Sequence, residues 1–118
     1  MSNVISARDA FGPLEMRSER RGDEHVIALS GELDLADAAR VAEELVRAEQ
    51  TDASRIILDL SGLQFIDTSG VRLIIEADAR SRANGTRLRL VRGPRAVRRV
   101  FEIVGLNERL PFVDAPLE

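Results

Sequence analysis

Two adjacent hydroxyl side chains, Thr68 and Ser69, follow Asp67 where an apolar segment gives way to an amphipathic one. Hydroxyls at such a position can accept a phosphoryl group. Residues 55–60 form a short β-branched and aliphatic run, and the residues after Gly70 repeat apolar side chains at helical spacing. The hydroxyls are therefore predicted at the start of a helix, where unpaired backbone N–H groups and the helix dipole favour a phosphate.

The same residues also suit ordinary helix capping. Ser, Thr and Asp are favoured N-cap residues, and each such cap is worth about 1 kcal/mol. Asp67, Thr68 and Ser69 are thus candidate caps for this helix, and Asp34 is a candidate cap or turn residue for the helix before it. The two roles, capping and phosphoryl acceptance, can coexist at one junction.

The composition excludes several classes of chemistry. The chain of 118 residues has no cysteine and one histidine, His25, which excludes disulfides, thiolate metal sites and multi-histidine zinc sites. All 17 basic residues are arginine, which excludes a phosphate-loop lysine and Schiff-base chemistry. We expect neither a metal nor a cofactor, and we expect His25 to be an ordinary strand residue.

Hydropathy and charge bound the location and the partners. No apolar run approaches the roughly 18 residues that a membrane span needs, and the first residues lack the apolar core of a signal peptide. A cytoplasmic protein with no membrane partner is expected. The four aromatic residues are all phenylalanine and the net charge is −3, which argues against direct nucleic acid binding.

The charge is unevenly distributed along the chain. Residues 23–52 contain nine acids and two arginines, a net charge of −7, whereas residues 86–109 contain seven arginines and two glutamates, a net charge of +5. Opposed patches of this kind favour oriented docking on a partner, although solvated surface faces also produce them.

The length and apolar content predict one domain at residues 11–118, preceded by a flexible segment at residues 1–10. Periodicity predicts four strands and a short fifth, at 14–18, 25–30, 55–60, 87–92 and 110–113, and helices at 35–46, 68–83 and 94–104. This order predicts an α/β fold with one mixed sheet of four to five strands and helices packed over it. The run at 55–60 is apolar on successive positions, as in a central strand covered on both faces.

The motifs of the chain resemble those of a known family when they are taken together and in order. Gly31-Glu32-Leu33-Asp34 precedes Asp67-Thr68-Ser69-Gly70 by 33 positions, and an Asn84-Gly85 helix stop and the segment from Val100 to Leu106 follow. In this arrangement the chain resembles the STAS domain of bacterial anti-sigma factor antagonists, over roughly residues 11–114.

The resemblance implies the STAS fold and a partner-switching mechanism. Such an antagonist is not an enzyme: unphosphorylated, it binds an anti-sigma factor that is also a serine/threonine kinase, and this releases a sigma factor. Phosphorylation ends the complex, and a metal-dependent serine/threonine phosphatase restores it. The family's phosphorylated residue, usually serine, corresponds to Thr68, with Ser69 as the rival acceptor. Expected partner-binding residues are Gly31, Glu32, Asp34, Asp67, Thr68, Ser69, Gly70 and Arg72, in a monomer or weak dimer.

Three other interpretations account for part of the same sequence. An Asp-Thr pair before glycine is typical of aspartic proteases, but Ser69 interrupts that loop and a long helix follows it. A phospho-aspartate receiver domain with Asp59 as the acceptor needs a lysine, which the chain lacks. The third keeps the fold and changes the function: a structural STAS subunit of a lipid-transport complex or a stress-sensing assembly.

Overall fold

A computed structural model describes residues 13–85 and 87–114. The predicted flexible segment at 1–10 and the predicted domain start near Phe11 lie outside these residues. Within them, five strands form one sheet in the order β1-β2-β3-β4-β5. The first two strands are antiparallel and all the others pair in parallel, so the sheet is mixed as predicted. The strands are β1 (Glu15–Arg21), β2 (Glu24–Leu33), β3 (Arg55–Ile66), β4 (Leu88–Val91) and β5 (Phe112–Val113).

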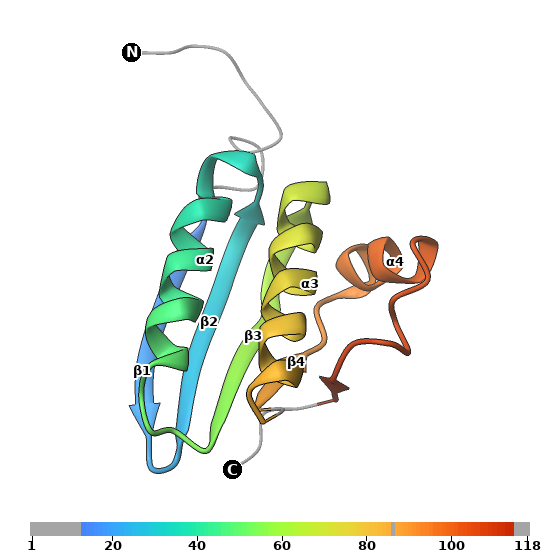
Figure 1. The fold of residues 1–118 in the computed structure, drawn as a ribbon. Helices are drawn as coiled ribbons and strands as arrows, with labels where there is room; N and C mark the ends of the chain where they lie inside the picture. The colour runs from blue at the N-terminus through green and yellow to red at the C-terminus, as the bar shows by residue number, and fades with distance from the viewer. Residues whose placement is uncertain (1–12, 86, 115–118) are drawn as a thin grey trace.

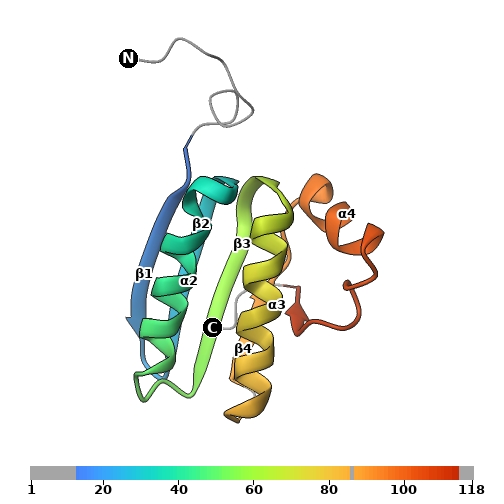
Figure 2. The same cartoon turned by 45° about the horizontal axis from the view of Figure 1, so that its top comes forward.

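Three helices pack on this sheet (Figure 1). They are α2 (Leu35–Glu49), α3 (Thr68–Ala83) and α4 (Arg95–Ile103). Helices α2 and α3 lie side by side on one face of the sheet, and α4 lies beyond α3, near the end of β4 (Figures 1 and 2). The connections β2-α2-β3 and β3-α3-β4 are the crossovers that parallel strands require.

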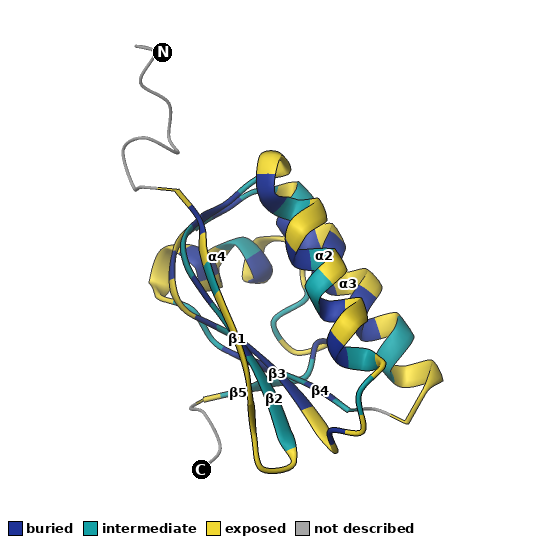
Figure 3. Cartoon of the chain, turned by 90° about the vertical axis from the view of Figure 1, so that its left-hand side faces the viewer, coloured by how far each residue is buried: buried dark blue, intermediate teal, exposed yellow. Residues whose placement is uncertain are grey.

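The core lies between the sheet and these helices, and it is aliphatic. Leu58 and Leu60 of the central strand β3 are fully buried, as is Leu45 of α2, and Phe101 of α4 is 1% exposed. Figure 3 shows the consequence for the helices, whose buried residues face the sheet while exposed residues face outward. Ile56, Ile57 and Leu58 are all buried, in agreement with the prediction of a central strand covered on both faces.

Three strands extend beyond the ends that the sequence pattern predicts, β1 by continuing to Arg21 instead of ending at residue 18. β2 continues through Leu33 and β3 continues to Ile66, whereas we predicted strand only to residues 30 and 60. The alternation of apolar and polar residues is interrupted in β2 and β3 because their pairing is irregular. The register between the two strands shifts after Ala28 and again after Gly31. Gly62 fits this irregular region because it has no side chain; a Cβ there would lie 2.8 Å from the Leu29 carbonyl oxygen.

The extended pairing positions the motifs. Leu33 is the last residue of β2 and Ile66 is the last residue of β3, and the two residues pair in the parallel sheet. Asp34 and Asp67 therefore follow the carboxyl ends of neighbouring strands and lie next to each other. Each then begins a helix. Two motifs 33 positions apart in the sequence thereby become one surface.

Burial predicts a large difference between two chemically identical substitutions. Leu58→Ala opens a cavity beneath α2 and α3, and we expect it to lower the free energy of unfolding by about 2–5 kcal/mol. The matched control is Leu35→Ala, at a side chain that is 75% exposed, where a change within about 0.5 kcal/mol is expected. Urea unfolding followed by circular dichroism measures both, and equal losses would contradict the described core.

Candidate functional site

Asp67 joins the beginnings of the two helices at the candidate site. It is the N-cap of α3, and its Oδ1 accepts hydrogen bonds from the backbone amides of Ser69 and Gly70 at 2.9 and 3.2 Å. Its Oδ2 accepts a third from the amide of Leu35, the first residue of α2, at 3.2 Å. One carboxylate therefore satisfies amides of two helices that would otherwise lack partners.

Further hydrogen bonds hold the backbone around Asp34 and Asp67 in place. Asp34 caps α2 by accepting a hydrogen bond from the amide of Ala36 at 3.0 Å, as predicted. The amide of Asp67 donates to the carbonyl oxygen of Leu33 at 3.1 Å, which holds the two strand ends together. The loops that carry the two motifs thus form one hydrogen-bonded unit.

The cap at Asp67 determines the local role of the two hydroxyls. Because Asp67 caps α3, neither Thr68 nor Ser69 does so, and no hydrogen bond of either hydroxyl is found among the described residues. Thr68 is the first residue of α3 and is exposed, whereas Ser69 is half-buried. Of the two candidate acceptors, Thr68 is the more accessible one.

Thr68 stands between two surface grooves. One groove, of about 330 Å³, runs between α2 and α3 and is lined by Leu35, Ala38 and Arg72 among others. The other lies between α3 and α4 and is lined mainly by aliphatic side chains, among them Ile75 and Val104. Thr68 and Arg72 line both grooves.

The exposed aliphatic residues are functional candidates that sequence reasoning missed. Leu35, Ile75 and Val104 are 75%, 41% and 50% exposed, respectively, and each lines one of the two grooves. Exposed apolar side chains gathered around a polar site are typical of protein interaction surfaces. Val104 is exposed because it is the C-cap of α4, which ends at Ile103.

The structure corrects our expectation of free amides at this helix start. The amides of Ser69 and Gly70 already donate to the Asp67 carboxylate, so they are not available to a phosphate as we predicted. A phosphate on Thr68 would instead lie next to that carboxylate. The cation available on the same helix is Arg72, one turn further, an exposed side chain without an ion pair in the part of the chain that the structure describes.

Three of the predicted partner-binding residues do not present a surface side chain. Glu32 is 1% exposed and Gly70 is buried, so a partner does not reach either in this conformation. Gly70 serves packing instead, since a Cβ there would lie 2.7 Å from Cγ1 of Ile66. Gly31 belongs to β2, where its φ of 88° accommodates the register shift, rather than to a turn after the strand.

The two charged stretches differ in how far they are neutralised. Five acids of residues 23–52 form ion pairs with arginines, for example Glu24 with Arg55 at 2.7 Å, and the others are Asp37, Glu44, Glu49 and Asp52. Among the described residues of the basic stretch, Arg92 forms an ion pair with Asp114. Arg95, Arg98, Arg99 and Arg109 have none there, so the positive patch is the one that stays uncompensated.

Residues 13–85 and 87–114 contain no group of three or more His, Cys, Asp or Glu side chains arranged to hold a metal ion. None of the described helices is long and apolar enough to cross a membrane.

Comparisons with known proteins agree with this geometry. The family model described as the STAS domain matches residues 15–116. An anti-sigma factor antagonist from Mycobacterium paratuberculosis has a similar structure, with a TM-score of 0.77 at 20% identity and 86% of each chain covered. The anti-sigma factor antagonist SpoIIAA in its unphosphorylated form gives a TM-score of 0.74 at 29% identity, covering 86% of this chain and 89% of that one. The Bacillus cell fate determinant SpoIIAA in the phosphorylated form gives 0.68 at 28% identity, covering 86% and 92%.

The two caps allow a matched test of the junction. Asp67→Ala removes the acceptor of three amides on two helices, and we expect it to lower the free energy of unfolding by about 2 kcal/mol. Asp34→Ala removes the acceptor of one amide, and a loss of about 1 kcal/mol is expected. Amide hydrogen exchange at Leu35, Ser69 and Gly70 should accelerate in the first variant and not in the second. Unchanged exchange at Leu35 in Asp67→Ala would contradict the bridge between the helices.

Proposed function

This chain belongs to the STAS domain family, and we propose that it acts as an anti-sigma factor antagonist switched by phosphorylation of Thr68. Unphosphorylated, it binds an anti-sigma factor that is also a serine/threonine kinase, and this binding releases a sigma factor. The structural neighbours named above, which are anti-sigma factor antagonists, support this role. SpoIIAA exists in an unphosphorylated and a phosphorylated form, which supports a phosphorylation switch here.

The observation that carries the proposal is the position of Thr68. Its hydroxyl is on an exposed first turn of α3, makes no hydrogen bond to the described residues and lies where two grooves meet. A kinase needs such an accessible hydroxyl, and a docking partner needs the apolar side chains around it. Ser69 is the second candidate acceptor, disfavoured because it is half-buried.

The charge of a phosphate explains how the same surface loses its partner. Phosphorylation adds about −1.5 to −2 charges at pH 7. The added charge lies beside the Asp67 carboxylate, which already occupies the helix amides, so the helix start neutralises it poorly. A partner fitted to a neutral hydroxyl then buries an uncompensated charge, and a cost of about 1.4 kcal/mol already weakens binding tenfold.

This switch needs no large rearrangement. The two loops are held by the Asp67 carboxylate and by the hydrogen bond from its amide to Leu33, and neither involves the Thr68 side chain. The phosphate therefore changes the charge of the docking surface while the backbone beneath it stays in place.

The same proposal assigns the remaining partners. A metal-dependent serine/threonine phosphatase restores the active form, and the chain itself catalyses no reaction. The protein acts in the cytoplasm, without contacting nucleic acid or membrane directly, as a monomer or weak dimer. Asp34, Asp67, Thr68, Ser69 and Arg72 form the polar part of the docking surface.

Phosphoryl transfer tests the proposal directly. Purified protein is incubated with radiolabelled ATP and each anti-sigma factor kinase encoded in the same genome. We expect label in the wild type and in Ser69→Ala, and none in Thr68→Ala, because Thr68 presents the free hydroxyl. Labelling of Thr68→Ala but not of Ser69→Ala would move the acceptor to Ser69. No labelling by any of these kinases, together with stable co-purification in a larger assembly, would favour the structural STAS subunit instead.

The charge environment of the phosphate gives a second prediction. In protein carrying phosphothreonine at position 68, the Arg72 guanidinium favours the doubly charged phosphate and lowers its second pKa. We expect Arg72→Gln to raise that pKa by about 0.5. Phosphorus NMR during a pH titration measures it, with Arg47→Gln on α2 as the control that leaves it unchanged. An unchanged pKa in Arg72→Gln would show that Arg72 does not face the phosphate.

A further inference from the structure

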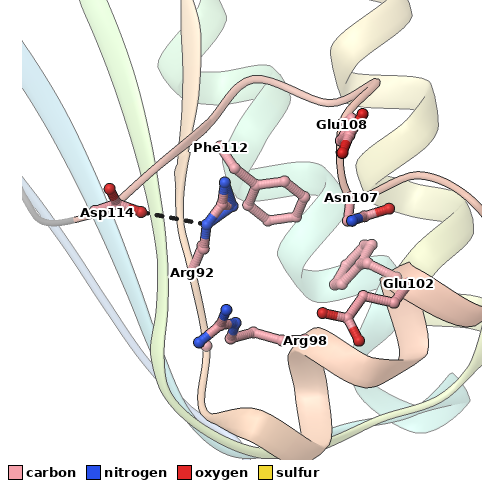
Figure 4. A pocket seen from close by; sticks show the side chains of 9 residues that line it. Arg92, Arg98, Glu102, Asn107, Glu108, Phe112 and Asp114 are labelled. Atoms are coloured by element: carbon pink, nitrogen blue, oxygen red, sulfur yellow. Dashed lines mark ion pairs between the residues drawn. The ribbon is translucent and has the colours of Figure 1, made fainter.

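A separate hollow lies on the other side of α4, between this helix and β5 (Figure 4). Its volume is about 320 Å³, and it shares no residue with the two grooves beside Thr68. Side chains from the loop after β4, from α4, from the loop after α4 and from β5 converge on it. This volume is at the lower end of the range for small-molecule sites, roughly 300–1,000 Å³.

One wall of the hollow consists of the Phe112 ring and of Arg92 and Asp114, whose opposite charges pair. The guanidinium carbon of Arg92 lies 5.1 Å from the centroid of the Phe112 ring, and its Nε lies 3.3 Å from Oδ1 of Asp114. The Phe112 ring in turn meets the buried Phe101 edge to face, at 5.2 Å between centroids. Arg92 is therefore held by a ring and a carboxylate, and its charge is already compensated.

The opposite wall carries one cation and one anion that do not pair. Arg98 and Glu102 are four residues apart on α4, a spacing at which such side chains commonly form an ion pair. They form none in the described part of the chain, and neither has another ion pair or hydrogen bond there. Figure 4 shows both side chains reaching into the hollow, with the Asn107 amide nearby.

A ligand of one charge would not satisfy this arrangement. Arg92 and Asp114 compensate each other, so the charged side chains of the hollow without an ion pair among the described residues are Arg98, Glu102 and Glu108. A plain anion would gain Arg98 but approach two carboxylates, and a plain cation would gain a carboxylate but approach Arg98. A small molecule that carries both charges can pair with Arg98 and with Glu102 at the same time. Its carbon skeleton would rest against Phe112.

We propose that this hollow binds a small zwitterion of the amino acid class. The ligand carboxylate pairs with Arg98, its ammonium group pairs with Glu102, and its side chain packs on Phe112. A ligand of this size at a partly open site supports a Kd of about 1 mM. Binding of this kind is independent of Thr68 and of the proposed switch.

A titration with three matched compounds tests the proposal. L-Phenylalanine, 3-phenylpropionate, which lacks the amine, and phenethylamine, which lacks the carboxylate, are added separately to the full isotope-labelled chain and followed by amide NMR spectra. We expect saturable shifts at Arg98, Glu102, Asn107 and Phe112 with phenylalanine, and binding at least about tenfold weaker for either analogue. No saturable shift, or equal binding of an analogue or of inorganic phosphate, would overturn the proposal.

Two variants assign each charge. Arg98→Gln should reduce the affinity for phenylalanine to that for phenethylamine, and Glu102→Gln should reduce it to that for 3-phenylpropionate. Arg99→Gln, at an exposed neighbour on α4 outside the hollow, and Thr68→Ala should both leave the affinity unchanged. Unchanged spectra away from α4 verify the fold of every variant, and retained affinity in both Arg98→Gln and Glu102→Gln would contradict the assignment. Because Thr68 takes no part, loss of the phosphorylation switch and loss of this site are separately observable.

Discussion

The carboxylate of Asp67 accepts hydrogen bonds from amides of both α2 and α3, and the candidate site depends on this bridge. Helix starts expose amides that must find partners, and two such starts meet where β2 and β3 end side by side. A single acceptor between them holds the helices in register with each other and with the sheet. The first turn of α3, which carries Thr68, is therefore presented on a rigid support.

The same interaction shapes the electrostatics of the proposed switch. Helix N-termini are ordinarily favourable places for a phosphate. In this protein a carboxylate already fills that place, so a phosphate added next to it brings repulsion as well as charge. A docking surface that accepts a neutral hydroxyl is then strongly altered by a small chemical change, without movement of the backbone beneath it.

The acidic and basic stretches also differ in how many of their charges form ion pairs. Ion pairs to arginine neutralise five acids of the acidic stretch, while four arginines of the basic stretch, three of them on α4, have no ion pair among the described residues. Three of the acidic pairs use arginines outside residues 23–52 and reduce the negative patch below its linear net charge, whereas the ion pair of Arg92 with Asp114 reduces the positive patch by one charge. Helix α4 borders the groove beside Thr68 on one side and the hollow at Phe112 on the other.

The sequence by itself determined the class of fold, the extent of α3 from 68 to 83 and the pair of motifs at 31–34 and 67–70, because these follow from local periodicity and from a short pattern of residues. It also marked Asp34 as a cap or turn residue, and the structure shows that it is the cap of α2. What tertiary structure decided is where pairing is irregular or long-range: the extension of β2 and β3 past their register shifts, the burial of Glu32 and Gly70, and the choice of Asp67 over Thr68 or Ser69 as the cap. The bridge to Leu35 joins residues 32 positions apart, and no local pattern encodes such a contact, because only the packing of two parallel strands brings their ends together.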